Sequence, residues 1–253
     1  MFKESNQIWL YLIGIIIMFG ILIAANTNIV VPFISGNRTI DPISGRFATA
    51  PEMIINKELN YFAVMETNFG NITLDLLEKN APVNVNNFVF LSNNGFYTNT
   101  KFHRLVPGFL LQGGDRNTLN DNPDDDGFGR PGYLIDDEIN WDSLKLSEEK
   151  KALLKALGYS STENLETPNF QRYVIGMANG GPNTNGSQFF ILINDKKDDR
   201  VNQLDGKFTP FAMIVDGFSV LEKISQIPVK NPDSQAPRPT EDIIIKKVEI
   251  FTR

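Results

Sequence analysis

The fold of this chain is decided by residues 102–115, which read Phe-His-Arg-Leu-Val-Pro-Gly-Phe-Leu-Leu-Gln-Gly-Gly-Asp. Two short apolar runs flank a Pro-Gly pair, an arrangement that predicts two strands meeting at a tight turn. Alternate side chains of a strand share a face, so Leu110 and Gln112 would point the same way, and Arg104 could join them from the neighbouring strand. The stretch therefore predicts a permanently charged guanidinium beside an apolar pocket.

Composition excludes several classes of protein. The chain has 253 residues, 42% of them hydrophobic, which is enough for one substantial domain with an appendage. Its net charge of −6 argues against a nucleic-acid partner, because affinity for a phosphate backbone depends on Lys and Arg gathered on one face. Cysteine is absent and His103 is the only histidine, so disulfides, thiolate chemistry, His-ligated metals and a Ser-His-Asp triad lack their residues. We expect no metal and no other cofactor.

The acidic run at 122–127 partly imitates a calcium-binding loop with a glycine at its sixth position. Its twelfth position is Tyr133, so the bidentate glutamate of such loops is missing. We therefore expect a solvated loop there.

The apolar run at residues 8–25 carries no charge, and its eighteen residues reach the lower limit for a helix that spans a bilayer. Trp9 and Tyr11 stand at its start, where aromatic rings favour the membrane interface. A cleaved signal peptide is the alternative, since Ala24 and Ala25 offer small residues for cleavage, but the run is longer than a usual signal-peptide core. We expect residues 1–25 to be a transmembrane anchor or signal segment, and we favour the anchor.

The charges beside this run carry little information about orientation. Lys3 is offset by Glu4, while Arg38 and Arg46 stand on the other side. An N-terminal apolar segment usually directs the export of the rest of its chain, so we expect the domain outside the cytoplasm, periplasmic or lumenal, with a secreted form if the segment is cleaved. Residues 26–57, rich in Asn, Thr, Ser, Pro and Gly, are expected to be a linker.

Residues 58–253 are predicted to form one mainly β domain. Helices are predicted at 80–94, with Asn80 as the cap and Pro82 in the first turn, and at 218–227. Many short strands with only two short helices favour a closed antiparallel barrel of eight strands, because closure removes exposed edges. The predicted strands are Phe62–Thr67, Ile72–Leu76, Phe102–Leu105, Phe109–Gln112, Tyr173–Met177, Phe189–Ile193, Ala212–Val215 and Ile243–Phe251.

Residues 141–167 interrupt this pattern and are predicted to be a helical insertion. Ser147 can cap a helix there, acidic residues follow in its first turn, and Gly158 can close it. A one-sided apolar stripe indicates a surface helix that patches the barrel; the alternative is an element that selects partners or substrates near the site. The stripe consists of Leu153, Leu154 and Leu157.

A second stretch completes the first. Residues 177–190 read Met-Ala-Asn-Gly-Gly-Pro-Asn-Thr-Asn-Gly-Ser-Gln-Phe-Phe, which predicts an irregular loop running into a buried strand. Together the two stretches closely resemble the cyclophilins, the barrel-shaped peptidyl-prolyl cis–trans isomerases. The resemblance extends from about Tyr61 to Phe251 around the insertion, and both long motifs occur in the right order.

The resemblance implies a mechanism. An X-Pro bond rotates over a barrier of about 18–20 kcal/mol because the nitrogen lone pair is shared with the carbonyl. Arg104 matches the catalytic arginine of the family, whose guanidinium donates a hydrogen bond to the prolyl nitrogen as that nitrogen pyramidalises. Gln112 matches the residue that orients the arginine, and Phe109 completes the catalytic set. No nucleophile, metal or nucleotide is required.

By the same resemblance, the other matched positions form the substrate groove. An apolar floor and rim accept the proline ring, backbone groups hold the peptide extended, and one polar side chain lines the groove. These residues are Leu110, Ala178, Asn179, Gln188, Phe190, Leu204 and Phe208. The implied partners are proline-containing polypeptides.

Several assignments have structural alternatives. The aromatic residues could be ordinary core, and Arg104 could be a surface charge or part of an ion pair. His103 is a candidate general base, but the matching position in the family is structural. Phe208 stands where much of the family has a histidine that closes the pocket, so an aromatic wall survives without a hydrogen-bonding edge. Gln203 replaces the tryptophan that contacts cyclosporin.

Three functions remain open at this stage. The first is a membrane-tethered isomerase that accelerates the folding of proteins at a membrane. The second is a proline-peptide binding or chaperone module with little turnover. The third is a membrane protein that uses the barrel as a platform through its insertion. The sequence gives neither the client nor the oligomeric state.

Overall fold

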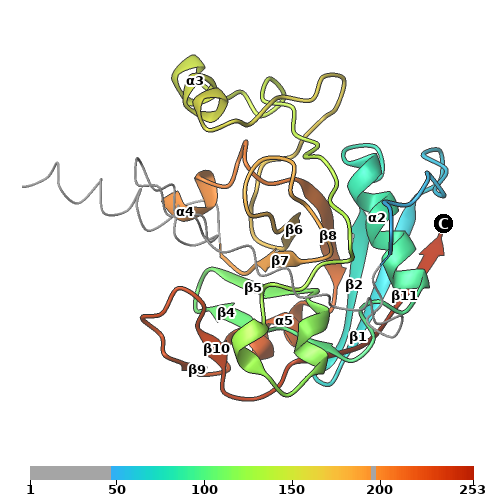
Figure 1. Ribbon diagram of the computed structural model, residues 1–253, viewed down its shortest axis with the longest axis vertical. Helices are drawn as coiled ribbons and strands as arrows, with labels where there is room; N and C mark the ends of the chain where they lie inside the picture. Colours follow the sequence, from blue (N-terminus) through green and yellow to red (C-terminus); the bar gives the residue numbers. More distant parts are fainter. Residues whose placement is uncertain (1–46, 195–197) are drawn as a thin grey trace, which may run out of the picture.

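The computed structural model describes residues 47–194 and 198–253 (Figure 1). One antiparallel sheet forms the body of the molecule, in the order β3-β11-β1-β2-β8-β6-β7-β5-β4. Its strands are β1 Tyr61–Thr67, β2 Gly70–Leu76, β3 Thr100–Lys101, β4 Arg104–Val106, β5 Leu110–Gly113, β6 Val174–Met177, β7 Phe189–Leu192, β8 Pro210–Asp216 and β11 Ile244–Thr252. A second, two-stranded sheet pairs β9 Val229–Lys230 with β10 Arg238–Pro239.

The predicted closed eight-stranded barrel is wrong: the main sheet has nine strands and is an open half-barrel, with β3 and β4 at its edges. Only Phe102 and His103 separate these two strands, and their amides bond elsewhere. Phe102 N–H donates to the carbonyl of Ile243 at 2.9 Å, and His103 N–H donates to that of Gln112 at 3.1 Å. The chain therefore bends between β3 and β4, and short edge strands leave little backbone to template further pairing.

β3, β9 and β10 have no counterpart among the predicted strands. Each is two residues long, too short to show the alternation by which a strand is recognised in a sequence.

Two helices pack on the sheet where helices are predicted. α2 (Pro82–Asn93) contacts β11 and β8, and α5 (Phe218–Ser225) contacts β2 (Figure 1). α2 buries Val85, Phe88 and Val89, and the ring of Phe88 lies 5.2 Å from that of Phe211 and 6.0 Å from that of Phe189. These aromatic contacts hold α2 against the sheet.

The start of α2 differs from the prediction. Its N-cap is Ala81, not Asn80, and Ala81 offers no side-chain hydrogen bond. The carboxylate of Glu138 takes that place, accepting from the backbone N–H groups of Val83 at 3.0 Å and Asn84 at 2.9 Å. A carboxylate at this end satisfies orphan amides and complements the helix dipole, so the segment before the insertion anchors α2.

The last part of the predicted linker packs against the domain. The ring of Phe47 lies 4.8 Å from that of Phe90, and Ile55 is buried. Asn86 Oδ1 accepts from Ile54 N–H at 2.7 Å, and Asn86 Nδ2 donates to the carbonyl of Glu52 at 2.9 Å. The packed unit therefore begins before residue 58. The predicted segment at 1–25 lies outside the described residues.

The insertion projects from one end of the sheet and carries α3 (Glu148–Ala156), with Ser147 as its N-cap (Figure 1). Of the three leucines expected to patch the barrel, only Leu154 is buried, in a small cluster with Ile139, Trp141 and Leu144 apart from the main core. Leu153 and Leu157 are exposed. The other helices are α4 Asp199–Asn202 and the 3₁₀ turns η2 Arg116–Leu119 and η3 Pro123–Asp125.

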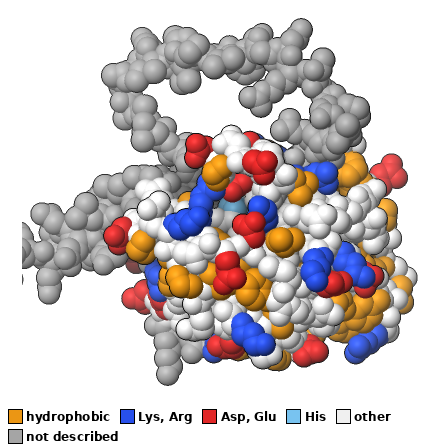
Figure 2. All heavy atoms as spheres, turned by 90° about the horizontal axis from the view of Figure 1, so that it is seen from below, with side chains coloured by type: hydrophobic (Ala, Val, Ile, Leu, Met, Phe, Trp, Pro, Cys, Tyr) orange, Lys and Arg blue, Asp and Glu red, His pale blue; other side chains and the backbone are white. Residues whose placement is uncertain are grey.

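Across residues 47–194 and 198–253, no helix combines the length and apolar character needed to cross a membrane. On the face seen in Figure 2, acidic and basic side chains of the described residues are interspersed rather than separated into fields of one sign.

Candidate active site

Arg104 on β4 lies opposite Gln112 on β5, so the predicted pairing of these side chains is confirmed. The Arg104 side chain is buried; its Nη1 donates to Oε1 of Gln112 at 3.0 Å and its Nε donates to the carbonyl of Gln235 at 3.0 Å. Both acceptors are neutral, and no carboxylate of the described residues lies within ion-pair distance. Burial lowers the pKa of Arg104 to about 10, so the guanidinium is oriented and still charged at neutral pH.

A chain of amides continues from the arginine. Gln112 Nε2 donates to Oε1 of Gln188 at 3.0 Å, and Gln188 Nε2 donates to the carbonyls of Gly127 at 2.9 Å and Gly129 at 3.0 Å. Each amide accepts a hydrogen bond at its oxygen from one neighbour and donates from its nitrogen to the next, which fixes the orientation of both amide groups. Arg104, Gln112 and Gln188, three of the predicted polar residues, thus form one connected network.

The predicted apolar residues of the site lie in one cluster, apart from the main core. Phe190 on β7 pairs with Gln112 on β5, and its ring stands perpendicular to that of Phe208 with 5.5 Å between centroids. The register of β5 and β7 therefore places the cluster beside the arginine. The cluster contains Phe109, Leu110, Phe170, Val174, Ala178, Phe190, Leu192, Val201, Leu204 and Phe208.

The loop from residue 178 to 188 is held by a buried carboxylate. Asp137 Oδ1 accepts from Nδ2 of Asn179 at 3.2 Å, and Asp137 Oδ2 accepts from the backbone N–H of Asn183 at 2.8 Å. Burial, reinforced by the charge of Asp136, raises the pKa of Asp137 to about 6 against these hydrogen bonds. Asn179 also donates to the carbonyl of Lys207 at 2.9 Å, so its side chain links two loops.

His103 is buried behind the site. Burial and the charges of Arg104 and Arg238 lower its pKa to about 3, so the ring is neutral over the physiological range. Its Nδ1 makes no hydrogen bond to the described residues. A general base would need a partner that orients the ring and shares its proton, and the described residues supply none at this nitrogen.

The acidic run uses two of its side chains in structural contacts. Asp126 pairs with Arg238 at 2.9 Å, and Asp125 accepts from Asn120 at 3.0 Å. Within the described part of the chain, no cluster of three or more acidic or histidine residues could hold a metal ion.

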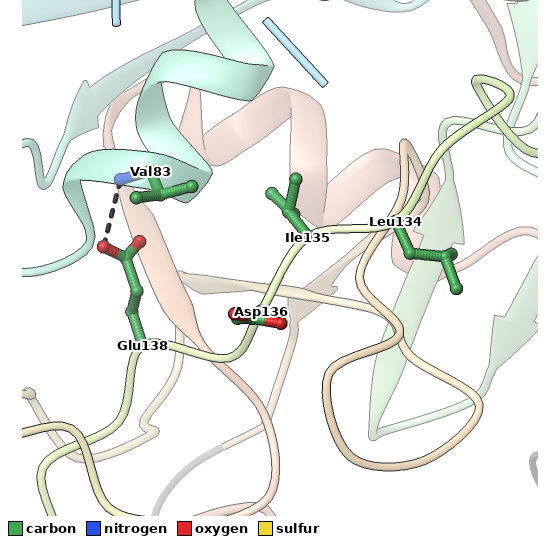
Figure 3. Close-up of a pocket in the computed structure, with 5 residues that line it drawn as sticks. All are labelled: Val83, Leu134, Ile135, Asp136 and Glu138. Atoms are coloured by element: carbon green, nitrogen blue, oxygen red, sulfur yellow. Dashed lines mark hydrogen bonds between the residues drawn. The ribbon is translucent and has the colours of Figure 1, made fainter. Parts of the chain in front are cut away.

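A pocket of about 270 Å³ lies away from the arginine, beside the start of α2 (Figure 3). Leu134, Ile135 and Val83 line it with two carboxylates. That of Glu138 is already engaged with the amides of α2, as the dashed line in Figure 3 marks for Val83. We therefore place the candidate site at Arg104 and the apolar cluster rather than in this pocket.

Several contributors to the site escape sequence reasoning. The carbonyl of Gln235 is a backbone group of an irregular segment and carries no signal in the sequence. The Arg200 guanidinium lies 4.6 Å from the centroid of the Phe109 ring. Phe170 packs against Phe190, with 5.5 Å between ring centroids. Val174 lies in a strand that was predicted, but its place in the apolar cluster was not.

The fold and the site together define a class: a mainly β half-barrel in which the buried Arg104, held by neutral acceptors, lies beside an apolar cluster. The family model for cyclophilin type peptidyl-prolyl cis-trans isomerases matches residues 62–250, and the chain belongs to this family. The matched domain is a peptidyl-prolyl cis–trans isomerase of the EC 5.2.1.8 class.

Among curated relatives, the peptidyl-prolyl cis-trans isomerase-like 1 of Gibberella zeae is 33% identical over 74% of this chain and 93% of its own. Isomerase B of Streptomyces anulatus is 33% identical over 76% of this chain and 97% of its own. The isomerase-like 2 of Cryptococcus neoformans is 36% identical over 75% of this chain, but the match spans only 27% of that longer protein.

A solved structure supports the fold. The cyclophilin type isomerase of Cryptosporidium parvum, crystallised in the presence of the dipeptide Ala-Pro, is 29% identical with a TM-score of 0.56, covering 76% of this chain and 99% of that one. The N-terminal 61 residues lie outside the family match.

Proposed function

We propose that this chain accelerates rotation about X-Pro bonds in protein clients, with Arg104 donating a hydrogen bond to the prolyl nitrogen. The observation that carries the proposal is the state of that guanidinium. It is 5% exposed, charged, and held by an amide oxygen and a backbone carbonyl rather than by a carboxylate. A cation paired with a carboxylate would have most of its field cancelled, whereas neutral acceptors orient it and leave its field intact.

The chemistry follows from the lone pair of the prolyl nitrogen. In the planar ground state that pair is delocalised into the carbonyl and accepts weakly; in the twisted state it is localised and accepts well. A fixed donor therefore binds the twisted state more tightly than the planar one, which is the condition for catalysis. Of the Arg104 nitrogens, Nε and Nη1 bond to described residues, which leaves Nη2 as the donor we assign to the substrate.

The proline ring would rest in the cluster around Phe190. Phe109, Leu110 and Leu204 supply apolar contact, and the ring of Phe208 forms a wall perpendicular to that of Phe190. Ala178 begins the loop whose backbone would run beside the extended peptide. The Ala-Pro dipeptide present with the Cryptosporidium relative supports this class of ligand.

The test is a protease-coupled isomerisation assay on a proline tetrapeptide with wild type and Arg104→Ala. We expect kcat/KM to fall by about 10²–10³-fold, the loss typical of removing one preorganised donor to a transition state. Arg104→Lys should recover only part of the lost kcat/KM. A guanidinium bonds Gln112 and Gln235 and still presents a further donor to the substrate, and an ammonium lacks this forked geometry. Equal rates for wild type and Arg104→Ala would defeat the catalytic assignment.

A second candidate is a proline-peptide binding module with little turnover. Phe208 favours it, because an aromatic wall without a hydrogen-bonding edge can hold a ring tightly and yet do nothing for the twisted state. Peptide binding by calorimetry, with no rate enhancement in the assay above, would select this function. Restoration of turnover by Phe208→His would locate the cause at that wall.

We further propose that residues 8–25 tether the domain to a membrane and that it assists folding outside the cytoplasm. The length and apolar character of the run support this, as does its lack of charge. Alkaline extraction of membranes should retain the full chain, and protease added outside intact cells or spheroplasts should digest the domain. Release of the chain on extraction would point to cleavage and a secreted form.

A further inference from the structure

The helical insertion contacts the loop at residues 203–209, which carries Leu204 and Phe208 of the apolar cluster. Trp141, at the start of the insertion, donates from Nε1 to the carbonyl of Gly206 at 3.2 Å. Gly206 has φ +93°, and a Cβ built on it would lie 2.6 Å from Cδ1 of Leu154 and 2.9 Å from Cδ1 of Leu146. Side chains of the insertion therefore lie directly on the backbone of this loop.

A second tie joins the same two elements. Lys150 on α3 donates from Nζ to the carbonyl of Asn202, the last residue of α4, at 2.9 Å. A cation on a carbonyl at the end of a helix is favourable, and here it fixes α3 to the turn that leads into residues 203–209.

The opposite side of this loop forms part of the candidate site. Leu204 and Phe208 flank Gly206 in the sequence and belong to the apolar cluster around Phe190. Residues 203–209 form neither helix nor strand. The N–H groups of Lys207 and Phe208 donate to the carbonyl of Leu204 at 3.0 and 3.3 Å, which closes the turn, and side chains contact the loop from both sides. From within the domain, Asp205 accepts from the backbone N–H of Phe170 at 2.8 Å.

We propose that the insertion is a positioning element for the proline pocket: Trp141 and Leu154 hold Gly206 so that Leu204 and Phe208 close on the ring of the substrate. This inference rests on the proposed function, since it assumes that the cluster around Phe190 takes a prolyl ring. Trp141 and Leu154 are positioning residues, because they lie behind the loop and touch no substrate. The arginine network is held by β4, β5 and β7 and does not depend on them.

The proposal separates binding from turnover. Loosening the loop should raise KM, because the ring loses its wall, and should leave kcat nearly unchanged, because Arg104 keeps its place. For Trp141→Phe, which deletes the donor and keeps an aromatic ring, we expect KM for a proline peptide to rise about fivefold, the worth of one net hydrogen bond. Leu154→Ala should raise it about tenfold or more, because it also leaves a cavity behind Gly206.

The matched control is Leu153→Ala on the same helix, since Leu153 is 53% exposed where Leu154 is 1% exposed. It should change neither KM nor kcat, and Leu154→Met should restore most of the affinity because it conserves volume. Thermal unfolding of each variant identifies any loss of folded protein. The methyl chemical shifts of Leu204 in NMR spectra should move in Trp141→Phe while those of Leu74 in the main core stay fixed.

The proposal is overturned if Trp141→Phe and Leu154→Ala both leave KM and the Leu204 chemical shifts unchanged. It is also overturned if Leu153→Ala changes KM as much as these two variants do. A fall in kcat without a rise in KM would overturn it as well. If wild type shows no isomerisation, the proposed function fails independently. Calorimetric peptide affinity and the Leu204 shifts then test the positioning role by themselves.

Discussion

The two walls of the candidate site are held in different ways. The arginine wall, with Arg104, Gln112 and Phe190, stands on three neighbouring strands whose ladder fixes each side chain. The opposite wall, with Leu204 and Phe208, stands on a loop closed by its own turn and held in place by contacts from segments distant in the sequence. The strand pairing of the sheet fixes the side chains of the first wall, whereas the position of the second wall depends on individual contacts.

This difference assigns separate tasks to the two walls. A donor that must meet a nitrogen in the twisted state tolerates little displacement, so strands are the suitable support. A wall that receives the proline rings of many clients can be adjusted with less loss. We therefore expect changes on the sheet side to act on kcat and changes on the loop side to act on KM, pH response and stability.

The largest effect that we expect outside the sheet is on stability as a function of pH, through Asp137, whose partner Asn179 also donates to the carbonyl of Lys207 in the 203–209 loop. Burial raises the pKa of Asp137 to about 6, whereas an unfolded aspartate titrates near 3.9. The folded state thus binds this proton more tightly. The stabilisation is complete below about pH 4 and is lost as the pH rises through about 6, with an upper limit of about 3 kcal/mol from the linkage relation.

Urea unfolding between about pH 4 and pH 7 measures this effect, and Asp137→Asn, which cannot ionise, should flatten the curve across that window. Glu138→Gln is the comparison, because burial raises the pKa of that carboxyl as well, but it binds α2 rather than the loop. If the slope of the unfolding free energy with pH were the same in wild type and Asp137→Asn, the titration would belong to other groups.

The same division explains what the sequence could and could not predict. Arg104 and Gln112 were predictable because eight residues and one turn join them, and the period of two settles which side chains share a face. The carboxylate of Glu138 that caps α2 comes from 54 residues away, and no local pattern signals such a pairing. Asn80 met every local rule for a cap and was displaced by this tertiary contact.

The sheet and the insertion show the same limit. Apolar alternation located eight strands but not whether the ends of the sheet pair, which depends on a bend at Phe102 and His103. The helix predicted around the three leucines is present, but the predicted buried stripe is wrong for two of them, because only Leu154 is buried. Periodicity predicts which side chains can be buried together, and the neighbouring surface decides how many are.

On the sheet side, Gln112→Leu should lower kcat/KM by about 30-fold, most of it in kcat. The change keeps the volume but removes the acceptor of Arg104 Nη1, and a hydrogen bond to a charged group is worth about 1.5–3 kcal/mol. Gln188→Leu provides the matched control: it breaks the network one residue further out and leaves the Arg104–Gln112 bond in place. Single-turnover isomerisation with both variants separates the two, and equal losses would show that the network acts as one unit.

The smallest effect that we expect comes from Gly206→Ala. At φ +93° an alanine is strained, and its Cβ would lie 2.6 Å from Cδ1 of Leu154, the end of a flexible side chain that can move away. The loop should shift rather than unfold, which costs about 1 kcal/mol and a Tm loss of about 2–4 °C. Gly95→Ala imposes similar backbone strain at φ +66°, with only Thr98 Oγ1 at 3.4 Å and no contact with the site. Both variants should therefore lose similar stability, while only Gly206→Ala raises KM. If KM rose in both variants, strain anywhere in the half-barrel would reach the site, and the distinction between the two walls would fail.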